Sequence, residues 1–392
     1  MSAAVEPATG TSGAIEARLP EVTRTGTAVG VLPGPPSRSA LTAALPPARP
    51  ARAVAVLIIL GVAVAVLALL SAGIGQMRLT PGEVIHVLAA RMGLMLGPEP
   101  AAPNADAVVM SIRLPRLALA GLSGAALATA GALMQGVFRN PLAEPGVIGV
   151  SSGAAAAACG GMALGLGALG PWGIALLAFA GGLGTTFLVY GLARSDGRTE
   201  VVTLVLTGVA VNAMAGAVIA LFVFLADTSA REEIIFWQLG SLNGTRWQYV
   251  AVAAPIVIAG AVAAMALARG LDLLALGERP ARHLGVDVER LRIWSIVLVA
   301  FLTAAAVAFS GIIAFVGLVV PHLIRMILGP GHRVLLPASA LGGAALLMAA
   351  DLAARTLVDY ADLPIGMLTA LVGGPFFFYL LRRTRRQAGG WG

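Results

Sequence analysis

The stretch AVAVLIILGVAVAVLALLSAG, residues 53–73, contains no charged side chain and decides how the rest of the sequence is interpreted. A helix of this length spans the roughly 30 Å of hydrocarbon in a bilayer. Because backbone groups in lipid must be satisfied internally, the stretch is predicted to be a membrane helix. Residues 1–52 lack apolar periodicity and are rich in Ala, Pro, Thr, Ser and Gly, which predicts a disordered tail. A cleaved signal peptide is the alternative, but its short charged region would directly precede the apolar core.

The whole composition extends this pattern. Hydrophobic residues make up 58% of the chain and charged residues 11%, against roughly 25% charged residues in a soluble domain. With a mean hydropathy of +0.90, the sequence is predicted to be a polytopic, all-α membrane protein. All 26 basic residues are arginines, and they cluster between apolar runs. That distribution suits orientation in a bilayer and argues against a nucleic-acid partner.

Nine further apolar runs bring the predicted number of membrane helices to ten. They cover residues 113–137, 147–167, 171–193, 201–225, 248–268, 291–310, 312–327, 334–356 and 365–381. An even number places both termini on one side, together with sixteen arginines, of which Arg49 and Arg52 lie at the end of the tail. Seven fall on the other side: Arg78, Arg91, Arg113, Arg116, Arg231, Arg246 and Arg355. The positive-inside rule therefore predicts that both termini, including the short tail 387–392, are cytoplasmic.

Two outer segments are predicted to be short helices. In the first, Thr80 and Glu83 have the spacing of a capping box, with Pro81 between them at the first helical position. Its apolar face is expected to comprise Val84, Leu88, Met92 and Met95. The second covers residues 231–242 and carries Phe236 and Trp237, which suit interfacial depth.

The groups that catalysis or ion coupling would need are scarce. Asp351 is the only acid well inside a predicted span, and it precedes Arg355 in the favourable i, i+4 order of an ion pair. Asn212 is expected to make an interhelical hydrogen bond, and Cys159 to be a small buried residue. Because the chain contains no lysine, it lacks a Walker-type phosphate-binding loop. The chain is therefore predicted to be no enzyme and to bind no metal or cofactor, with energy for uphill transport supplied by another subunit.

The stretch LGERPARHLGVDVERLR, residues 276–292, is unusually charged for this chain. Residues 278–284 can form about two helical turns, Gly285 can end them, and Asp287 can cap the next helix. The prediction is a helix, a glycine turn and a new helix along the cytoplasmic surface. An ordinary charged loop between spans is the alternative.

Four segments resemble the iron-chelate, haem and cobalamin permeases of type II ABC importers. The first is RLPRLALAGLSGAALATAGALMQGVFRNPLAEPGVIGVSSGAA, residues 113–155, and the second is residues 276–292. The others are GIIAFVGLVVPHLIRMILGPGHRVLLPASAL, residues 311–341, and LPIGMLTALVGGPFFFYLLRR, residues 363–383. The resemblance spans residues 53–386 in motif order. It implies a ten-helix subunit that forms a homodimer, with the translocation pathway between the two copies.

The resemblance also implies roles for particular residues. Residues 276–290 resemble coupling helices that dock on a cytoplasmic ATPase, with contacts expected at Glu278, Arg279, Ala281, Arg282, Leu284 and Gly285. On the outer face, Arg113, Arg116 and Arg355 are expected to pair with glutamates of a binding protein; interfacial anchoring is the alternative. The motif residues Asn140, Pro141, Pro145, Gly146, Gly149 and Ser151 are expected either to shape the cytoplasmic end of the pathway or to form a structural corner.

The implied partners are a second copy, an ABC ATPase dimer that holds ATP and Mg, a periplasmic substrate-binding protein and membrane lipid. The implied location is a bacterial inner membrane. Haem is the expected cargo, followed by ferric siderophores and then cobalamin. An ATPase-independent secondary transporter is the alternative from a different class.

Overall fold

Helices make up most of the computed structural model, which describes residues 50–170, 172–195 and 198–387. The long helices are α2 (Pro50–Gly73), α5 (Leu114–Phe138), α7 (Gly173–Leu192), α8 (Val201–Leu225), α10 (Trp247–Leu274), α12 (Val288–Ser310), α14 (His332–Thr356) and α15 (Ile365–Gln387). The shorter helices are α3 (Pro81–Ala90), α4 (Ala105–Ala107), α6 (Val150–Ala163), α9 (Thr228–Gln238), α11 (Glu278–His283) and α13 (Val316–Leu328). Short helical turns are η1 (Val108–Arg113), η2 (Pro145–Ile148) and η3 (Leu166–Leu169), and the strands are β1 (Arg194–Ser195) and β2 (Arg198–Thr199).

Each of the ten predicted apolar runs contains one helix, which confirms an all-α polytopic membrane protein. Within the described ranges, seven helices are long and apolar enough to cross a bilayer. The remaining three are shorter: α6 has 14 residues, α13 has 13, and the apolar part of α15 covers Ile365–Tyr379. The count of ten crossings therefore stays a prediction. The predicted tail 1–52 lies outside the described residues except for 50–52, which open α2, and of the tail 387–392 only Gln387 is described, at the end of α15.

The eighth predicted span, 312–327, is only partly helical, because α13 begins at Val316. Gly311 and Phe315 have φ values of 67° and 68°, which break the helix on both sides of the connecting segment. This segment is held by its neighbours: Ser241 N–H donates to the Ser310 carbonyl, and Gly240 and Gly366 lie against the Ile312 carbonyl. Irregular backbone at this depth is stable where it packs inside protein.

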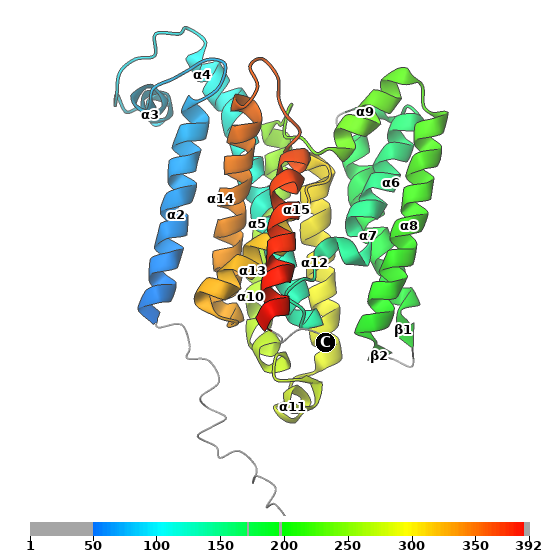
Figure 1. Ribbon diagram of the computed structural model, residues 1–392. Helices are drawn as coiled ribbons and strands as arrows, with labels where there is room; N and C mark the ends of the chain where they lie inside the picture. Colours follow the sequence, from blue (N-terminus) through cyan, green and yellow to red (C-terminus); the bar gives the residue numbers. More distant parts are fainter. Residues whose placement is uncertain (1–49, 171, 196–197, 388–392) are drawn as a thin grey trace, which may run out of the picture. The chain divides into compact units, whose positions relative to one another are not determined.

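The centre of the bundle is the helical stretch Ala105–Phe138, of whose most apolar window 83% is buried, against 6% for α2. Two glycine contacts bring neighbouring backbones against α5. Gly124 touches Gly343 of α14, and Gly131 touches the carbonyl of Gly317 on α13. Small residues at such positions let helices approach closely, which compensates for the weak hydrophobic drive in lipid. In Figure 1, α2 lies at the edge of the bundle beside α14.

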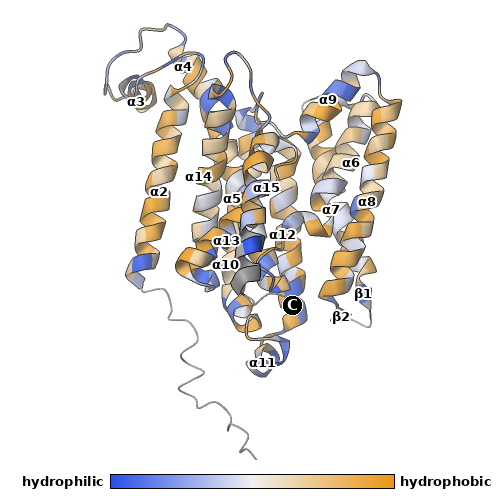
Figure 2. Cartoon of the chain, in the orientation of Figure 1, coloured by the Kyte–Doolittle hydropathy of each residue, from blue (hydrophilic) through white to orange (hydrophobic). Residues whose placement is uncertain are grey.

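Polar elements gather at the two ends of the bundle (Figure 1). The start of α2, the β1–β2 hairpin and α11 lie at one end, whereas α3, α4 and α9 lie at the other. Figure 2 shows apolar colour along most of the helix lengths and hydrophilic residues concentrated at the ends. This separation agrees with the predicted grouping of loops. Which end faces the cytoplasm stays a prediction.

Both predicted outer helices are present. In α3, the Thr80 amide donates to the Glu83 carboxylate at 2.7 Å and the Glu83 amide donates to Thr80 Oγ1 at 3.3 Å, which confirms the capping box. The predicted apolar face was wrong beyond Ala90, because α3 ends there and Met92 and Met95 are exposed. The second helix, α9, begins at Thr228, where Asp227 caps it.

Candidate functional site

The charged stretch between α10 and α12 folds as predicted. Gly285, at a φ of 85°, terminates α11 two residues after its last helical residue, His283. The Gly285 amide donates to the Arg282 carbonyl, and the Val286 amide donates to the Ala281 carbonyl. This pair of bonds is a Schellman motif, which satisfies carbonyls at the end of a helix. Asp287 then caps α12 by accepting from the Arg290 amide at 3.0 Å. In Figure 1, α11 projects beyond the neighbouring ends of α10 and α12.

The predicted coupling residues differ in their exposure. Arg279, Arg282, Leu284 and Gly285 are exposed and can meet a partner. Ala281 is fully buried, so its side chain seats α11 on this chain instead of facing outward. Its proposed contact with a partner would have to use the backbone.

Glu278 is half-buried and already engaged within the chain. Its Oε1 accepts from Arg292 Nη2 at 2.9 Å, and its Oε2 lies 3.5 Å from Arg282 Nη2. Arg292 lies near the start of α12 and is 4% exposed. From the sequence alone, Arg292 counted only as one of the positive charges that set the predicted orientation. The sequence does show that Arg292 follows Glu289 by three residues, which is the spacing of an ion pair along one helix.

A groove of about 760 Å³ lies beside this cluster. One wall comes from Thr199, Glu200, Val201 and Val202, at the start of α8. The facing residues come from α11, α12 and their connection, including Arg282, Val286 and Asp287. This end of the bundle thus has a protruding helix beside a charged groove.

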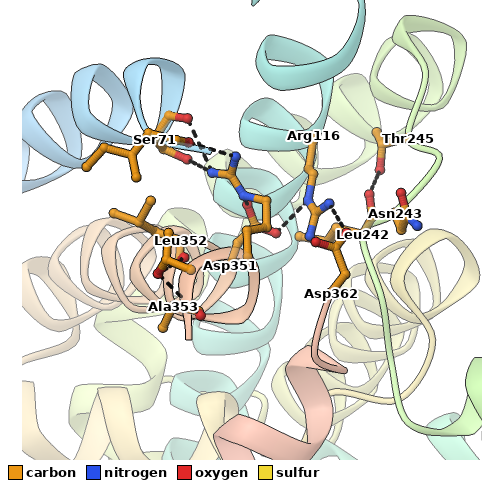
Figure 3. Close-up of polar contacts among 12 residues, drawn as sticks. Ser71, Arg116, Leu242, Asn243, Thr245, Asp351, Leu352, Ala353 and Asp362 are labelled. Carbon is orange, nitrogen blue, oxygen red and sulfur yellow. Dashed lines mark hydrogen bonds and ion pairs between the residues drawn. The ribbon is translucent and has the colours of Figure 1, made fainter. Parts of the chain in front are cut away.

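The outer arginines form a buried network (Figure 3). Arg116 donates to Asp351 at 2.7 Å and to Asp362 at 2.6 Å. Arg355 lies 3.1 Å from the other Asp351 oxygen, which confirms the predicted i, i+4 pair, and donates to Ser71 Oγ at 2.5 Å. Asp351 is 1% exposed. Helices α2, α5 and α14 are therefore joined at their outer ends.

Arg113 holds the outer end of α2. Its guanidinium donates to the carbonyls of Ala72 at 2.5 Å, Gly73 at 3.0 Å and Met77. A cation beside the last carbonyls of a helix satisfies them and complements the helix dipole. Arg113 and Arg116 are 5% and 6% exposed, so they could meet a binding protein only by releasing these bonds. Their docking role stays a prediction.

The motif beginning at Asn140 forms a tight corner between α5 and α6. Arg139 ends α5 in the left-handed region, and Asn140 Oδ1 accepts from the Leu142 amide at 2.9 Å. Pro145 opens the 3-10 turn η2, and Gly149, at a φ of 83°, leads into α6. Pro141 lies in the turn between α5 and η2.

Helix α8 is hydrogen-bonded to this corner through Asn212, which contacts two residues of the motif region. Asn212 of α8 donates to the Gly146 carbonyl at 3.1 Å, and Asn212 Oδ1 accepts from Ser152 Oγ at 2.5 Å. The expected interhelical bond of Asn212 is confirmed, and its hydroxyl partner is Ser152 of α6. Gly208, one turn earlier, packs against the Val147 carbonyl. Burial raises the pKa of the Glu144 carboxyl within the same corner.

A mostly apolar notch of about 440 Å³ opens beside the 311–315 segment. It is lined by Gln238, Leu239, Ile312, Ala314, Gly366, Met367, Ala370 and Leu371. Among the described residues, no group of three or more His, Cys, Asp or Glu could hold a metal ion. Because its lining is mostly apolar, the notch suits contact with an apolar surface better than polar recognition.

A helical membrane domain with a polar helix protruding from one end has the architecture of a membrane transport subunit. Residues 62–383 match the FecCD transport family, and the chain belongs to that family. The resemblance found from the sequence is thus confirmed.

Individual relatives refine the comparison. The chain is 47% identical over 281 residues to the cobalamin import system permease BtuC of Halobacterium salinarum, covering 71% of this chain and 74% of that protein. It is 44% identical over 286 residues to the hemin transport system permease HmuU of Yersinia pestis, covering 72% and 85%. A solved metal-chelate type ABC transporter in an inward-facing conformation has a TM-score of 0.73 and 33% identity, covering 83% of this chain and 98% of that one. These relatives agree with a transport subunit and not an enzyme.

Proposed function

We propose that this chain is the transmembrane subunit of a binding-protein-dependent ABC importer. The observation that carries the proposal is α11, a short polar helix that projects from the apolar bundle and is seated by the buried Ala281. A knob held at fixed height can be moved as a rigid body by a neighbouring domain. ATP binding and hydrolysis on a separate ATPase would then alternate access to the pathway.

The proposed unit is a homodimer with the pathway between the two copies. Support comes from α8, of whose most apolar window only 17% is buried, with Leu206, Val209, Met214 and Phe224 exposed. Lipid would cover part of this surface and a second copy the remainder. A crosslink between exposed α8 positions of two protomers would test this arrangement.

The proposed cargo is a large metal macrocycle, with haem first. Haem is favoured because the motif segments resemble those of haem permeases most, and because the relative HmuU is named as a hemin permease. Cobalamin is the second candidate, because the relative at 47% identity is named as a cobalamin permease. The apolar notch beside Ile312 supports either, since a large planar cargo needs weak contacts along a wide path.

The proposed orientation places α11 and both termini in the cytoplasm of a bacterial cell, with the network of Arg113, Arg116 and Arg355 facing the binding protein. Arginine counts on the two sides support this orientation. Accessibility of an introduced cysteine at Leu284 or Tyr360 to a membrane-impermeant reagent in intact cells checks it. Tyr360 is 90% exposed at the opposite end, so it should react first.

The decisive experiment is reconstitution of the chain with a candidate ABC ATPase and binding protein in proteoliposomes. We expect ATP-dependent uptake, and greatest stimulation of ATP hydrolysis by haem-loaded binding protein when compared with cobalamin-loaded and siderophore-loaded protein. The double variant Arg279→Ala with Arg282→Ala should stop uptake, whereas Arg269→Ala, an exposed arginine of α10, should not. Uptake by the chain alone, driven by a proton gradient, would establish the secondary-transporter alternative instead.

A further inference from the structure

The cluster around Arg292 connects three separate elements at the inner end of the molecule. Arg292 Nη2 donates to Glu278 Oε1 of α11 at 2.9 Å. Its Nη1 donates to the Thr199 carbonyl of β2 at 2.6 Å and to Glu289 Oε2, on its own helix, at 3.3 Å. The guanidinium therefore joins α11 and α12 to the hairpin that precedes α8.

Glu289 extends the same cluster to α7. Its Oε1 accepts from Thr199 Oγ1 at 2.6 Å and from the Tyr190 hydroxyl at 3.3 Å, and its Oε2 accepts from the Thr199 amide at 3.3 Å. Tyr190 lies in the last turn of α7, and α8 begins two residues after Thr199. Arg292 and Glu289 thus hold the end of α7 and the start of α8 close to the first residue of α11, Glu278.

Burial makes these contacts strong and directional. Arg292 is 4% exposed and Thr199 is 2% exposed, so water competes weakly for the hydrogen bonds. Arginine suits this position because its planar guanidinium offers several donors in a fixed geometry, whereas lysine is a point charge. Arg292 Nε has no partner among the described residues, which shows that the side chain is placed by its two terminal nitrogens.

The surrounding geometry gives the cluster a mechanical role. The groove lined by Val201 and Val202 on one side and by Val286 and Asp287 on the other separates the start of α8 from the α11–α12 connection. Arg292 and Glu289 join the two walls of this groove, and of these two only Arg292 also bonds a residue of α11, Glu278, among the described residues.

We infer that Arg292 is a positioning residue that fixes the coupling helix α11 to the β1–β2 hairpin, so that movement of α11 is passed to α7 and α8. This inference rests on the proposed function for the force that moves α11. The link itself is a property of the chain alone and can be measured without an ATPase.

The first test measures the link in the isolated protein. Spin labels are placed at Leu284→Cys and Val202→Cys, two exposed positions on either side of the groove, in a Cys159→Ala background. Labelled protomers are diluted with unlabelled ones so that the distance within one protomer is read. We expect a narrow distance distribution in the parent and in Arg269→Gln, and a broad one in Arg292→Gln and Glu278→Gln. An unchanged distribution in Arg292→Gln would overturn the inference.

The second test measures coupling in proteoliposomes with the ATPase and binding protein. In Arg292→Gln we expect ATP hydrolysis to persist while cargo transported per ATP falls at least about fivefold, the lower end of typical coupling between distant sites. Arg292→Lys should recover only part of the loss, because one ammonium cannot reproduce the fork geometry.

Other results of this test separate the two hypotheses. A merely structural role would lower hydrolysis and transport in proportion, and this would contradict the inference. Absence of ATP-dependent transport in the wild type would overturn the proposed function, while the spin-label result would still decide whether Arg292 links α11 to α8.

Discussion

Asp272 on α10 caps the first residue of α14. One of its oxygens, Oδ1, accepts from the His332 backbone amide at 2.7 Å and lies 2.7 Å from His332 Nδ1. Gly331, at the N-cap position, provides no side chain for this purpose, so a residue sixty positions earlier satisfies the start of the helix. Asp272 lies two residues before the end of α10, which leads into α11.

Removing this tertiary cap should destabilise the inner end of the bundle. In Asp272→Ala, the amide and ring of His332, which is 1% exposed, lose their acceptor, and leaving such groups unpaired costs about 1–3 kcal/mol. Asp272→Asn keeps an oxygen acceptor and should lose less. Cys159, the single cysteine, is buried, so its reaction with a thiol-reactive dye on heating reports unfolding. Equal transition temperatures for Asp272→Ala and the wild type would contradict a capping role.

The outer network should contribute more to stability than an exposed ion pair on the same face. Arg116→Gln leaves Asp351, 1% exposed, with Arg355 as its remaining cation, and breaking a buried pair costs about 3–5 kcal/mol. The matched control is Arg91→Gln, which removes the Arg91–Asp106 pair with side chains 58% and 52% exposed and should cost at most about 1 kcal/mol. The same Cys159 assay compares them. Similar small losses in both variants would show that the buried network adds little stability.

Close packing of α5 against α13 should not tolerate a methyl group. In Gly131→Ala the new carbon would overlap the Gly317 carbonyl, so the two helices must separate, at a typical overpacking cost of about 1–3 kcal/mol. Gly184→Ala on α7 meets no neighbour within 4 Å and should be neutral or stabilising, since alanine favours helix over glycine by about 1 kcal/mol. The transition temperature should therefore fall for Gly131→Ala and should stay unchanged or rise for Gly184→Ala. A tolerated Gly131→Ala would mean that the helices do not touch at this point.

The outer helix α3 should loosen in acid. Hydrogen bonds from the Thr80 amide and hydroxyl, followed by that from the Ala101 amide, hold the pKa of Glu83 below its ordinary value of 4.5. A carboxyl with a depressed folded pKa stabilises the fold above its unfolded pKa and loses that effect as pH falls through the folded value. Hydrogen exchange of residues 81–90, corrected for intrinsic rates, should therefore accelerate below pH 4.5. Glu83→Gln should exchange faster at neutral pH and show little further change; a wild-type profile as flat as that of the variant would argue against the capping box.

Local sequence chemistry determined much of this protein. Apolar runs identified every long helix, since a backbone in lipid must satisfy its hydrogen bonds internally. Thr80 with Glu83, Gly285 and Asp287 located three helix ends correctly, because capping depends on residues only a few positions apart. The family resemblance likewise rested on contiguous motifs.

Tertiary structure decided what the charged residues do. Arg113 and Arg116, at the start of the second predicted span, were expected to meet a binding protein or to anchor the span end. In the structure, carbonyls of α2 and carboxylates more than two hundred positions away enclose them. The linking role of Arg292 is visible only in the tertiary structure, where its guanidinium bonds both β2 and α11. A buried charge is stabilised by whichever partners the packing of distant helices brings within hydrogen-bond reach, and that packing is not encoded in any local spacing.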